Sequence, residues 1–301
     1  MRVLVTGGGG FVGRRLVARL ASGGHAVVAG VGPGSAGPAG APSVALDITH
    51  DGCIAAALEP GMDAVVHLAA VSSGGDARRS PGVAWEVNAA GTARLAEAVA
   101  ASGARLLLVS TAEVYGAGTG PRREDEAPMP LSPYAASKLA GELAVQEVGR
   151  RLGLPHVIIR PFPHTGAGQD TRFVIPAFAE RIRQAVARGE GTVRVGNLEP
   201  VRDFLHVDDV VDAYVDLLDA PPDGTIYNVA SGSGLSIGEL FRRLARLAGA
   251  DVEAVTDPTL IRPADIPELI GDAGRLRAAT GWRPRRDVDT ALREVLGAEA
   301  D

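Results

Sequence analysis

The sequence of 301 residues predicts an α/β fold built on a doubly wound parallel sheet. Three observations support this prediction. Short apolar runs alternate with longer segments of helical periodicity, a glycine-rich turn follows the first apolar run, and small or polar residues follow several later ones. Because the strands of a parallel sheet end at one edge, we expect these residues to line a single ligand site there.

The first strand is expected at residues 3–6, followed at once by a glycine cluster and by a helix over 14–21. Glycines at these positions permit a tight turn and a close approach of a ligand to the backbone. The N-terminus of the helix then offers free N–H groups to a pyrophosphate, as in Rossmann dinucleotide-binding domains. The residues expected to bind the dinucleotide here are Gly7, Gly10, Phe11, Val12 and Gly13.

The second strand, expected at residues 26–31, bears on the choice of dinucleotide. An acidic residue near its end would hold the adenosine ribose of NAD, and an arginine would accommodate the 2′-phosphate of NADP. Residues 30–42 contain neither, so the choice between NAD and NADP stays open.

Further strands are predicted at residues 44–46, 64–68, 106–110 and 157–159. Small and polar residues at their carboxyl ends would let a cofactor approach the sheet closely. The residues expected to contact the cofactor at these ends are Asp47, Ile48, Leu68, Ala69, Ala70, Ser110 and Pro161.

A helix predicted over about 133–151 carries a tyrosine and a lysine four residues apart, Tyr134 and Lys138. Lys138 is the one lysine among 30 cationic residues, which suggests that an amine is required there. Residues i and i+4 share a helix face. We therefore expect the ammonium to lower the pKa of the Tyr134 phenol and to make it a proton donor near neutral pH.

Composition excludes several classes of function. A net charge of -6 and an aromatic content of 4% argue against nucleic-acid binding. The sequence shows no signal peptide and no apolar run of membrane-spanning length, so a cytosolic protein without membrane contact is expected. The single cysteine, Cys53, forms no internal disulfide, and no metal site is predicted. Residues 117–131 are rich in Gly, Pro and charge and are expected to form a mobile surface loop, with the acidic run 124–126 in solvent.

The motifs taken together resemble the extended short-chain dehydrogenase/reductases, the NAD-dependent epimerase/dehydratase family that acts on nucleotide sugars. The resemblance covers essentially the whole chain. The motifs that carry it are Gly7-x-x-Gly10-x-x-Gly13, His67-Leu68-Ala69-Ala70, Ser110-Thr111, Val114-Tyr115-Gly116, Tyr134-x-x-x-Lys138 and Arg202-Asp203-Phe204-x-His206-Val207-x-Asp209.

The resemblance implies roles for the catalytic residues. Thr111 would orient the substrate oxygen, Tyr134 would act as acid and base, and Lys138 would hold the nicotinamide ribose. Dehydratases of this family carry acidic residues directly after the catalytic threonine, so Glu113 keeps dehydration possible.

Downstream segments are similar to the reductases of GDP-4-keto-6-deoxymannose. They are residues 160–169, 172–174, 195–199 and 261–267. That similarity implies a cofactor contact for His164. Pro163 stands where these reductases usually have Asn, and Ala167 where they have Pro, which leaves the identity of the sugar undetermined.

The resemblance also implies a domain division. A dinucleotide-binding Rossmann domain would comprise residues 1–166 and 199–230, and a smaller, discontinuous substrate domain would comprise 167–198 and 231–301. Arginine supplies the paired hydrogen bonds that a diphosphate accepts. The arginines expected to bind the nucleoside-diphosphate sugar are Arg172, Arg202 and Arg262.

Three functions follow as hypotheses. The first is reduction of a 4-keto-6-deoxy nucleotide sugar by NADH or NADPH. The second is a redox-neutral 4-epimerase or 4,6-dehydratase, and the third is a non-catalytic dinucleotide-binding sensor, against which the intact Thr111, Tyr134 and Lys138 argue. By resemblance, a homodimer would form through helices at 85–101 and 133–151.

Overall fold

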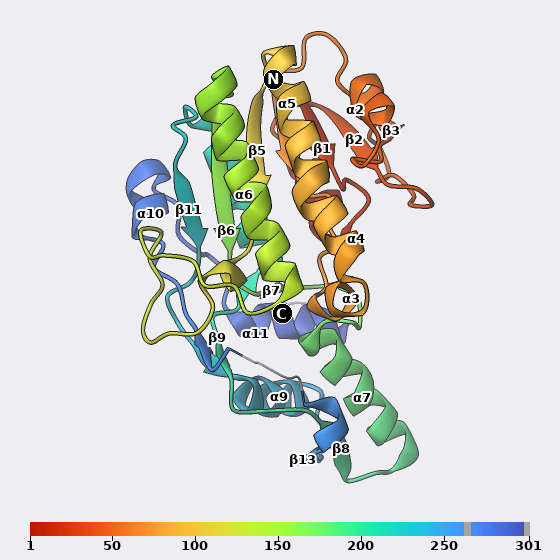
Figure 1. Ribbon diagram of the computed structural model, residues 1–301. Helices are drawn as coiled ribbons and strands as arrows, with labels where there is room; N and C mark the ends of the chain where they lie inside the picture. Colours follow the sequence, from red (N-terminus) through yellow and green to blue (C-terminus); the bar gives the residue numbers. More distant parts are fainter. Residues whose placement is uncertain (262–265, 298–301) are drawn as a thin grey trace.

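The computed structural model describes residues 1–261 and 266–297 and is organised around a seven-stranded sheet (Figure 1). The strand order is β11-β6-β5-β4-β1-β2-β3, and every pairing is parallel. This confirms the predicted fold class. The strands are β1 (Arg2–Thr6), β2 (Ala26–Val31), β3 (Ser43–Ala45), β4 (Ala64–His67), β5 (Arg105–Val109), β6 (His156–Pro161) and β11 (Ile226–Val229).

The strand order reverses direction at β1, which has β2 on one side and β4 on the other. In register, Thr6 pairs with Gly30 and with His67, so the ends of these three strands are level. A crevice opens at such a switch point, and ligands of doubly wound sheets bind there.

Both faces of the sheet are buried. Val3 and Val5 of β1 belong to one core and Leu4 to the other, because successive side chains of a strand point to opposite faces. Helices α1 (Phe11–Ser22) and α8 (Val207–Asp219) pack together on one face. Helices α5 (Thr92–Ser102) and α6 (Pro133–Leu152) pack together over the other, in front of the sheet in Figure 1. The remaining helices around the sheet are α2 (Asp51–Ala57), α3 (Gly74–Arg79), α4 (Pro81–Trp85) and α10 (Gly274–Thr280).

The helix predicted over 85–101 is divided. A π-helical stretch, η1 (Glu86–Gly91), connects α4 to α5. A Cβ at Gly141 of α6 would lie 2.6 Å from the Asn88 carbonyl oxygen, so glycine there permits close packing of α6 on η1. The Asn88 amide donates to Ser137 of α6 at 3.0 Å and fixes the contact.

A third core lies beyond the carboxyl edge of the sheet (Figure 1). It is built from separate segments of the second half of the chain, and the Phe178 and Phe241 rings meet in it edge to face at 5.3 Å. Its elements are α7 (Val174–Arg188), β8 (Thr192–Val195), α9 (Ile237–Leu247), β13 (Glu253–Thr256) and α11 (Val288–Leu296). Short elements link this core to the sheet: η2 (Ala112–Tyr115), β7 (His164–Thr165), β9 (Val201–Arg202), β10 (Leu205–His206), β12 (Leu235–Ser236), η3 (Pro258–Leu260) and β14 (Glu268–Leu269).

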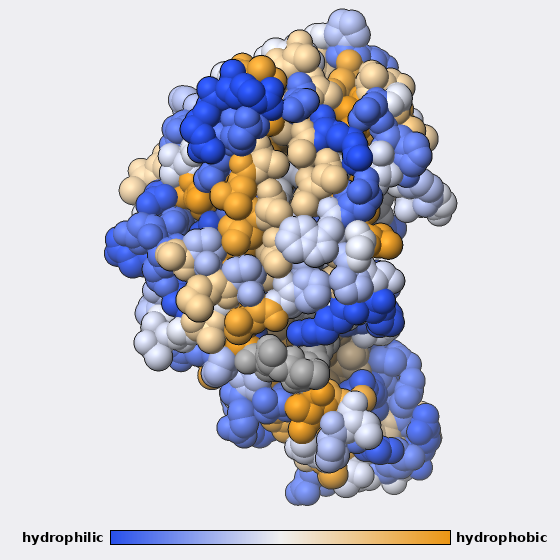
Figure 2. All heavy atoms as spheres, viewed as in Figure 1, coloured by the Kyte–Doolittle hydropathy of each residue, from blue (hydrophilic) through white to orange (hydrophobic). Residues whose placement is uncertain are grey.

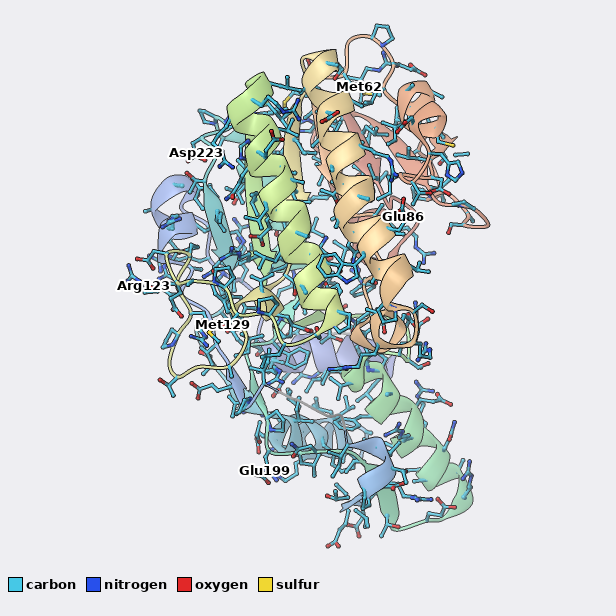
Figure 3. All side chains as sticks on the ribbon, in the orientation of Figure 1. Met62, Glu86, Arg123, Met129, Glu199 and Asp223 are labelled. Atoms are coloured by element: carbon cyan, nitrogen blue, oxygen red, sulfur yellow. The ribbon has the colours of Figure 1, made fainter. Side chains whose placement is uncertain are left out.

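The expectation for residues 117–131 is wrong in part. Figure 3 marks Arg123 and Met129 on this loop, and both side chains are exposed. Arg122, however, is buried, and its backbone forms a parallel β-bridge with Gly271. The Glu124 carboxylate accepts a hydrogen bond of 2.9 Å from the Asn228 N–H. The loop is therefore attached to the sheet by partners distant in sequence. Across the described residues, no helix combines the length and the apolar character needed to cross a membrane.

Candidate active site

A cleft of about 1580 Å³ lies between the carboxyl edge of the sheet and the third core. It collects every expected site residue except Arg262, which lies outside the described residues. The expected residues that line it are Gly7, Gly10, Phe11, Val12, Gly13, Asp47, Ile48, Leu68, Ala69, Ala70, Ser110, Thr111, Glu113, Tyr134, Lys138, Pro161, His164, Arg172 and Arg202.

The glycine turn fits a dinucleotide. Gly7 has a φ of +68°, and a Cβ there would lie 2.9 Å from the Ala69 nitrogen, so this close approach of β1 and β4 requires glycine. A Cβ at Gly13 would collide with the Gly7 carbonyl. Gly10 is the N-cap of α1 and makes no side-chain cap, so the first N–H groups of α1 face the cleft without a capping side chain. Such a helix end binds a pyrophosphate.

A chain of hydrogen bonds holds the end of β4 in place. The Thr6 hydroxyl accepts from the Leu68 and Ala69 N–H groups at 3.2 and 3.1 Å, so its own proton points to His67 Nδ1 at 2.7 Å. His67 Nε2 then donates to the Thr92 hydroxyl at 3.1 Å. Burial lowers the pKa of His67 to about 3, with a smaller effect of the Lys138 charge, so the imidazole is neutral. His67 is thus a structural support for the cleft.

Tyr134 and Lys138 lie one turn apart at the start of α6. The Ser132 hydroxyl caps this helix by accepting from the Ala135 N–H at 3.1 Å. Lys138 is buried, and its Nζ donates to the Val109 carbonyl at the end of β5 over 2.6 Å. Burial lowers the pKa of Lys138 to about 8, partly opposed by the Glu142 carboxylate.

The expectation that Lys138 lowers the pKa of the Tyr134 phenol is wrong. Burial raises the pKa of Tyr134 well above its usual value, and the Glu113 carboxylate raises it further, while a hydrogen bond with Thr111 opposes the shift. Burial dominates because the phenolate would lose its hydration. The phenol therefore keeps its proton at neutral pH, which still suits a proton donor.

A buried ion pair lies close to Lys138. The Arg160 guanidinium contacts the Glu142 carboxylate with Nη2 at 2.6 Å and Nε at 3.0 Å, and the two side chains are 3% and 2% exposed. The Ser110 hydroxyl also donates to Glu142. Arg160 packs over the Tyr115 ring at 4.8 Å, which orients its guanidinium. This network joins the ends of β5 and β6 to α6.

The arginines expected to bind substrate differ in their surroundings. Arg172 is exposed and forms ion pairs with Asp170 at 3.0 Å and with Asp76 of α3 at 2.6 Å, across the mouth of the cleft. Arg202 projects from β9 and donates to the Val201 carbonyl at 2.8 Å. Arg172 and Arg202 thus line the cleft as expected, and Arg262 lies outside the described residues.

Among the cleft residues that the sequence analysis did not single out, Arg14 and Tyr214 bear most on ligand binding. Arg14 lines the cleft from the first turn of α1, and its place directly after Gly13 was the available signal. Tyr214 of α8 is buried beneath the cleft, and its hydroxyl has no hydrogen-bond partner among the residues that the structure describes. A buried hydroxyl without a partner is costly, so a polar group of a ligand or a water would be favoured there.

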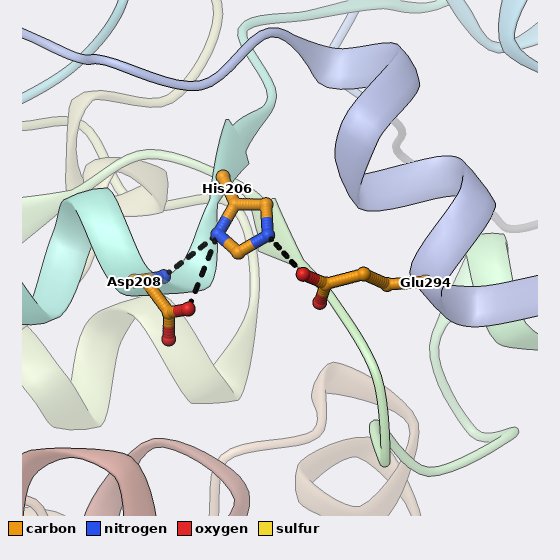
Figure 4. A group of neighbouring side chains, drawn as sticks. All are labelled: His206, Asp208 and Glu294. Carbon is orange, nitrogen blue, oxygen red and sulfur yellow. Dashed lines mark hydrogen bonds and ion pairs between the residues drawn. The ribbon is translucent and has the colours of Figure 1, made fainter. Parts of the chain in front are cut away.

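A cluster of His206, Asp208 and Glu294 beside the cleft has the composition of a metal site (Figure 4). Its ligand atoms are already engaged. His206 Nδ1 accepts from the Asp208 N–H and Nε2 donates to Glu294, both at 3.0 Å. Arg15 of α1 pairs with Asp208 at 2.8 Å and lies 3.8 Å from Glu294. The cluster therefore binds α1, α8 and α11 together.

Comparison with known proteins agrees with this geometry. The NAD dependent epimerase/dehydratase family matches residues 3–230. GDP-6-deoxy-D-mannose reductase of Pseudomonas aeruginosa is 35% identical over 98% of this chain and 96% of its own. UDP-glucose 4-epimerase of Mycolicibacterium smegmatis is 34% identical over 95% of this chain and 94% of its own. The structure of RMD from Pseudomonas aeruginosa complexed with NADPH superposes with a TM-score of 0.87, at 34% identity over 98% of this chain and 97% of that one.

The family match covers the glycine turn, Tyr134, Lys138 and the central sheet from Val3 onward. The relatives extend the similarity through the third core to nearly the full length of the chain. The resemblance stated from the motifs is thereby confirmed: this chain belongs to the NAD dependent epimerase/dehydratase family.

Proposed function

We propose that the chain is a reductase that transfers hydride from NADH or NADPH to C4 of a nucleotide-linked 4-keto-6-deoxy sugar, of the GDP-4-keto-6-deoxymannose type. The observation that carries the proposal is the cleft that brings the dinucleotide-binding glycine turn together with Thr111, Tyr134 and Lys138. The 35% identity to a GDP-6-deoxy-D-mannose reductase over nearly the whole chain supports the choice of a 4-keto sugar.

The reaction adds a hydride to C4 and a proton to O4, and yields an alcohol and the oxidised cofactor. The reduced nicotinamide supplies the hydride when it is bound. Tyr134 supplies the proton from its phenol, and Thr111 orients the substrate oxygen, in keeping with the hydrogen bond between these two side chains. Lys138 holds the nicotinamide ribose. Glu113 faces the same centre and would take the C5 proton if the enzyme were a dehydratase.

The remaining assignments follow the elements of the cleft. The first turn of α1 holds the pyrophosphate of the cofactor, the residues at the ends of β3, β4 and β6 flank it, and Arg202 and Arg172 bind the diphosphate of the sugar nucleotide. Residues 167–198 and 231–301 form the substrate domain, which is supported by the separate core around Phe178 and Phe241. Residues 1–166 and 199–230 form the dinucleotide-binding domain.

The reductase assignment is tested by the fate of the cofactor. A reductase consumes one NADH or NADPH per product, so the absorbance of reduced nicotinamide falls in proportion to GDP-4-keto-6-deoxymannose converted. An epimerase or dehydratase recycles the hydride and gives no net loss. If a 4-hydroxy nucleotide sugar were converted with catalytic NAD and no added reduced cofactor, the redox-neutral function would replace the proposed one.

A homodimer is part of the proposal. Apolar side chains gather over α5 and α6 in Figure 2, and Leu143 in the middle of α6 is 56% exposed. Two such helix pairs would bury this face in a four-helix bundle. Light scattering at micromolar concentration should give a dimer, and Leu143→Glu should give a monomer. Val186→Glu, at an equally exposed position of α7, is the control that leaves the dimer intact.

A further inference from the structure

The adenosine end of the cleft carries no carboxylate on the segment where NAD binding requires one. Residues 32–46, which follow β2, contain no acidic side chain. They fold against the glycine turn, since a Cβ at Gly9 would collide with the Ala36 carbonyl, and the Ser35 N–H closes a turn on Gly32 at 3.1 Å. Gly9, Gly32 and Ser35 all line the cleft. An NAD ribose would thus find no carboxylate acceptor from this segment.

Arg14 supplies a positive charge at this end of the cleft. It lies one helical turn after Gly10, whose backbone is open to the cleft, and the two positions share a face of α1. Its side chain is exposed, and within residues 1–261 and 266–297 no hydrogen bond or ion pair engages it. The neighbouring Arg15 and Arg19, in contrast, are paired with Asp208 and Asp212.

We propose that the chain selects NADPH over NADH, and that Arg14, with the Ser35 hydroxyl, receives the 2′-phosphate of the adenosine ribose. A phosphate monoester carries a charge of roughly −2 near neutral pH and offers oxygen acceptors that suit a guanidinium fork. The 2′-hydroxyl of NADH offers no charge to Arg14. The inference rests on the family's use of NAD(P) and is independent of the identity of the sugar.

The test measures cofactor affinity without a sugar substrate, so that its outcome does not depend on the reductase assignment. The full chain is titrated with NADPH and with NADH, and binding is followed by the fluorescence of the reduced nicotinamide. The wild-type protein should bind NADPH at least about tenfold more tightly than NADH, because one charge-assisted hydrogen bond changes affinity by about that factor. Arg14→Gln should weaken NADPH binding by about tenfold or more and leave NADH binding within about twofold.

The control is Arg19→Gln, an equal change of charge on the same helix at a position that does not line the cleft. It should leave both affinities unchanged. Equal or tighter binding of NADH by wild type would overturn the proposal. An equal loss of affinity for both cofactors in Arg14→Gln would also overturn it, since Arg14 would then contact a part that the two cofactors share. Unchanged affinity for both cofactors in this variant would overturn it as well. Circular dichroism melts of each variant verify that the fold is retained.

Discussion

Lys138 Nζ and the Val109 carbonyl oxygen are joined by a hydrogen bond of 2.6 Å, which ties helix α6 to the end of β5. The contact anchors the lysine at the floor of the cleft, where burial lowers its pKa to about 8. His67, the ionisable neighbour on β4, is neutral, and Glu142 is paired with Arg160. Lys138 is therefore the group near the cofactor site that changes charge just above neutral pH.

This pKa predicts how cofactor affinity depends on pH. Below pH 8 the side chain is an ammonium that attracts the anionic cofactor and donates to ribose hydroxyls, and above pH 8 it is a neutral amine. Affinity for NADPH should therefore fall as pH rises from 7 to 9. Fluorescence titrations across this range should show the fall in wild type and not in Lys138→Met. An identical pH dependence in the variant would assign it to another group.

Turnover should depend on the Tyr134 phenol. Tyr134→Phe removes the proton donor and keeps the aromatic ring, so we expect a loss of at least ~10²-fold in kcat with cofactor affinity retained. Single-turnover measurements with saturating NADPH separate the two effects. Tyr227→Phe is a suitable control, since its hydroxyl bonds Asp223 outside the cleft. Turnover near that of wild type in Tyr134→Phe would exclude the phenol as the acid.

Much of the site was predictable because it depends on local patterns. Apolar runs followed by small residues identify strand ends, and the parallel arrangement then brings those ends to one edge. Gly7, Ser110 and Pro161, separated by up to 154 positions, line one cleft for this reason. The bounds of β2 also match those predicted, 26–31, since glycines lie close to both ends of the run.

Features that depend on tertiary burial were not predictable. The spacing of Tyr134 and Lys138 fixes their shared helix face, but the raised pKa of Tyr134 comes from burial by distant segments. Composition suggested a solvated loop at 117–131, yet Glu124 finds its partner at Asn228, more than a hundred residues away. Whether Arg14 faces the cleft or solvent is likewise decided by the packing of α1 on the sheet.

Binding of the nucleotide sugar should depend more on Arg202 than on Arg172. Arg172 is exposed, so solvent screens its contact with a diphosphate, whereas Arg202 is half-buried. We expect Arg202→Ala to weaken binding of a nucleoside diphosphate by roughly 1.5–3 kcal/mol, and Arg172→Ala by less. Calorimetry with the diphosphate alone measures both, and NADPH affinity serves as the internal control. Unchanged affinity in Arg202→Ala would make that residue structural.

The free energy of unfolding should depend on the buried pair of Arg160 and Glu142. Arg160→Met leaves the Glu142 carboxylate without its cation in the interior, and such a loss costs about 3–5 kcal/mol. Urea unfolding of the protein without added cofactor measures this loss as the difference in unfolding free energy between wild type and variant. Arg151→Met, which breaks the exposed pairs with Glu147 and Glu97, should destabilise the fold far less, because solvent screens both pairs.

The double variant Arg160→Met with Glu142→Met separates the pair from the packing of its parts. Both charges are then absent, so the cost of an unpaired buried charge disappears. The remaining destabilisation comes from the loss of two contacts, that of Ser110 with Glu142 and that of Arg160 with Tyr115. The double variant should therefore be more stable than Arg160→Met alone. If the losses of the two single variants simply added, the residues would not be coupled. The ion pair would then contribute nothing of its own to holding β5, β6 and α6 together beneath the cleft.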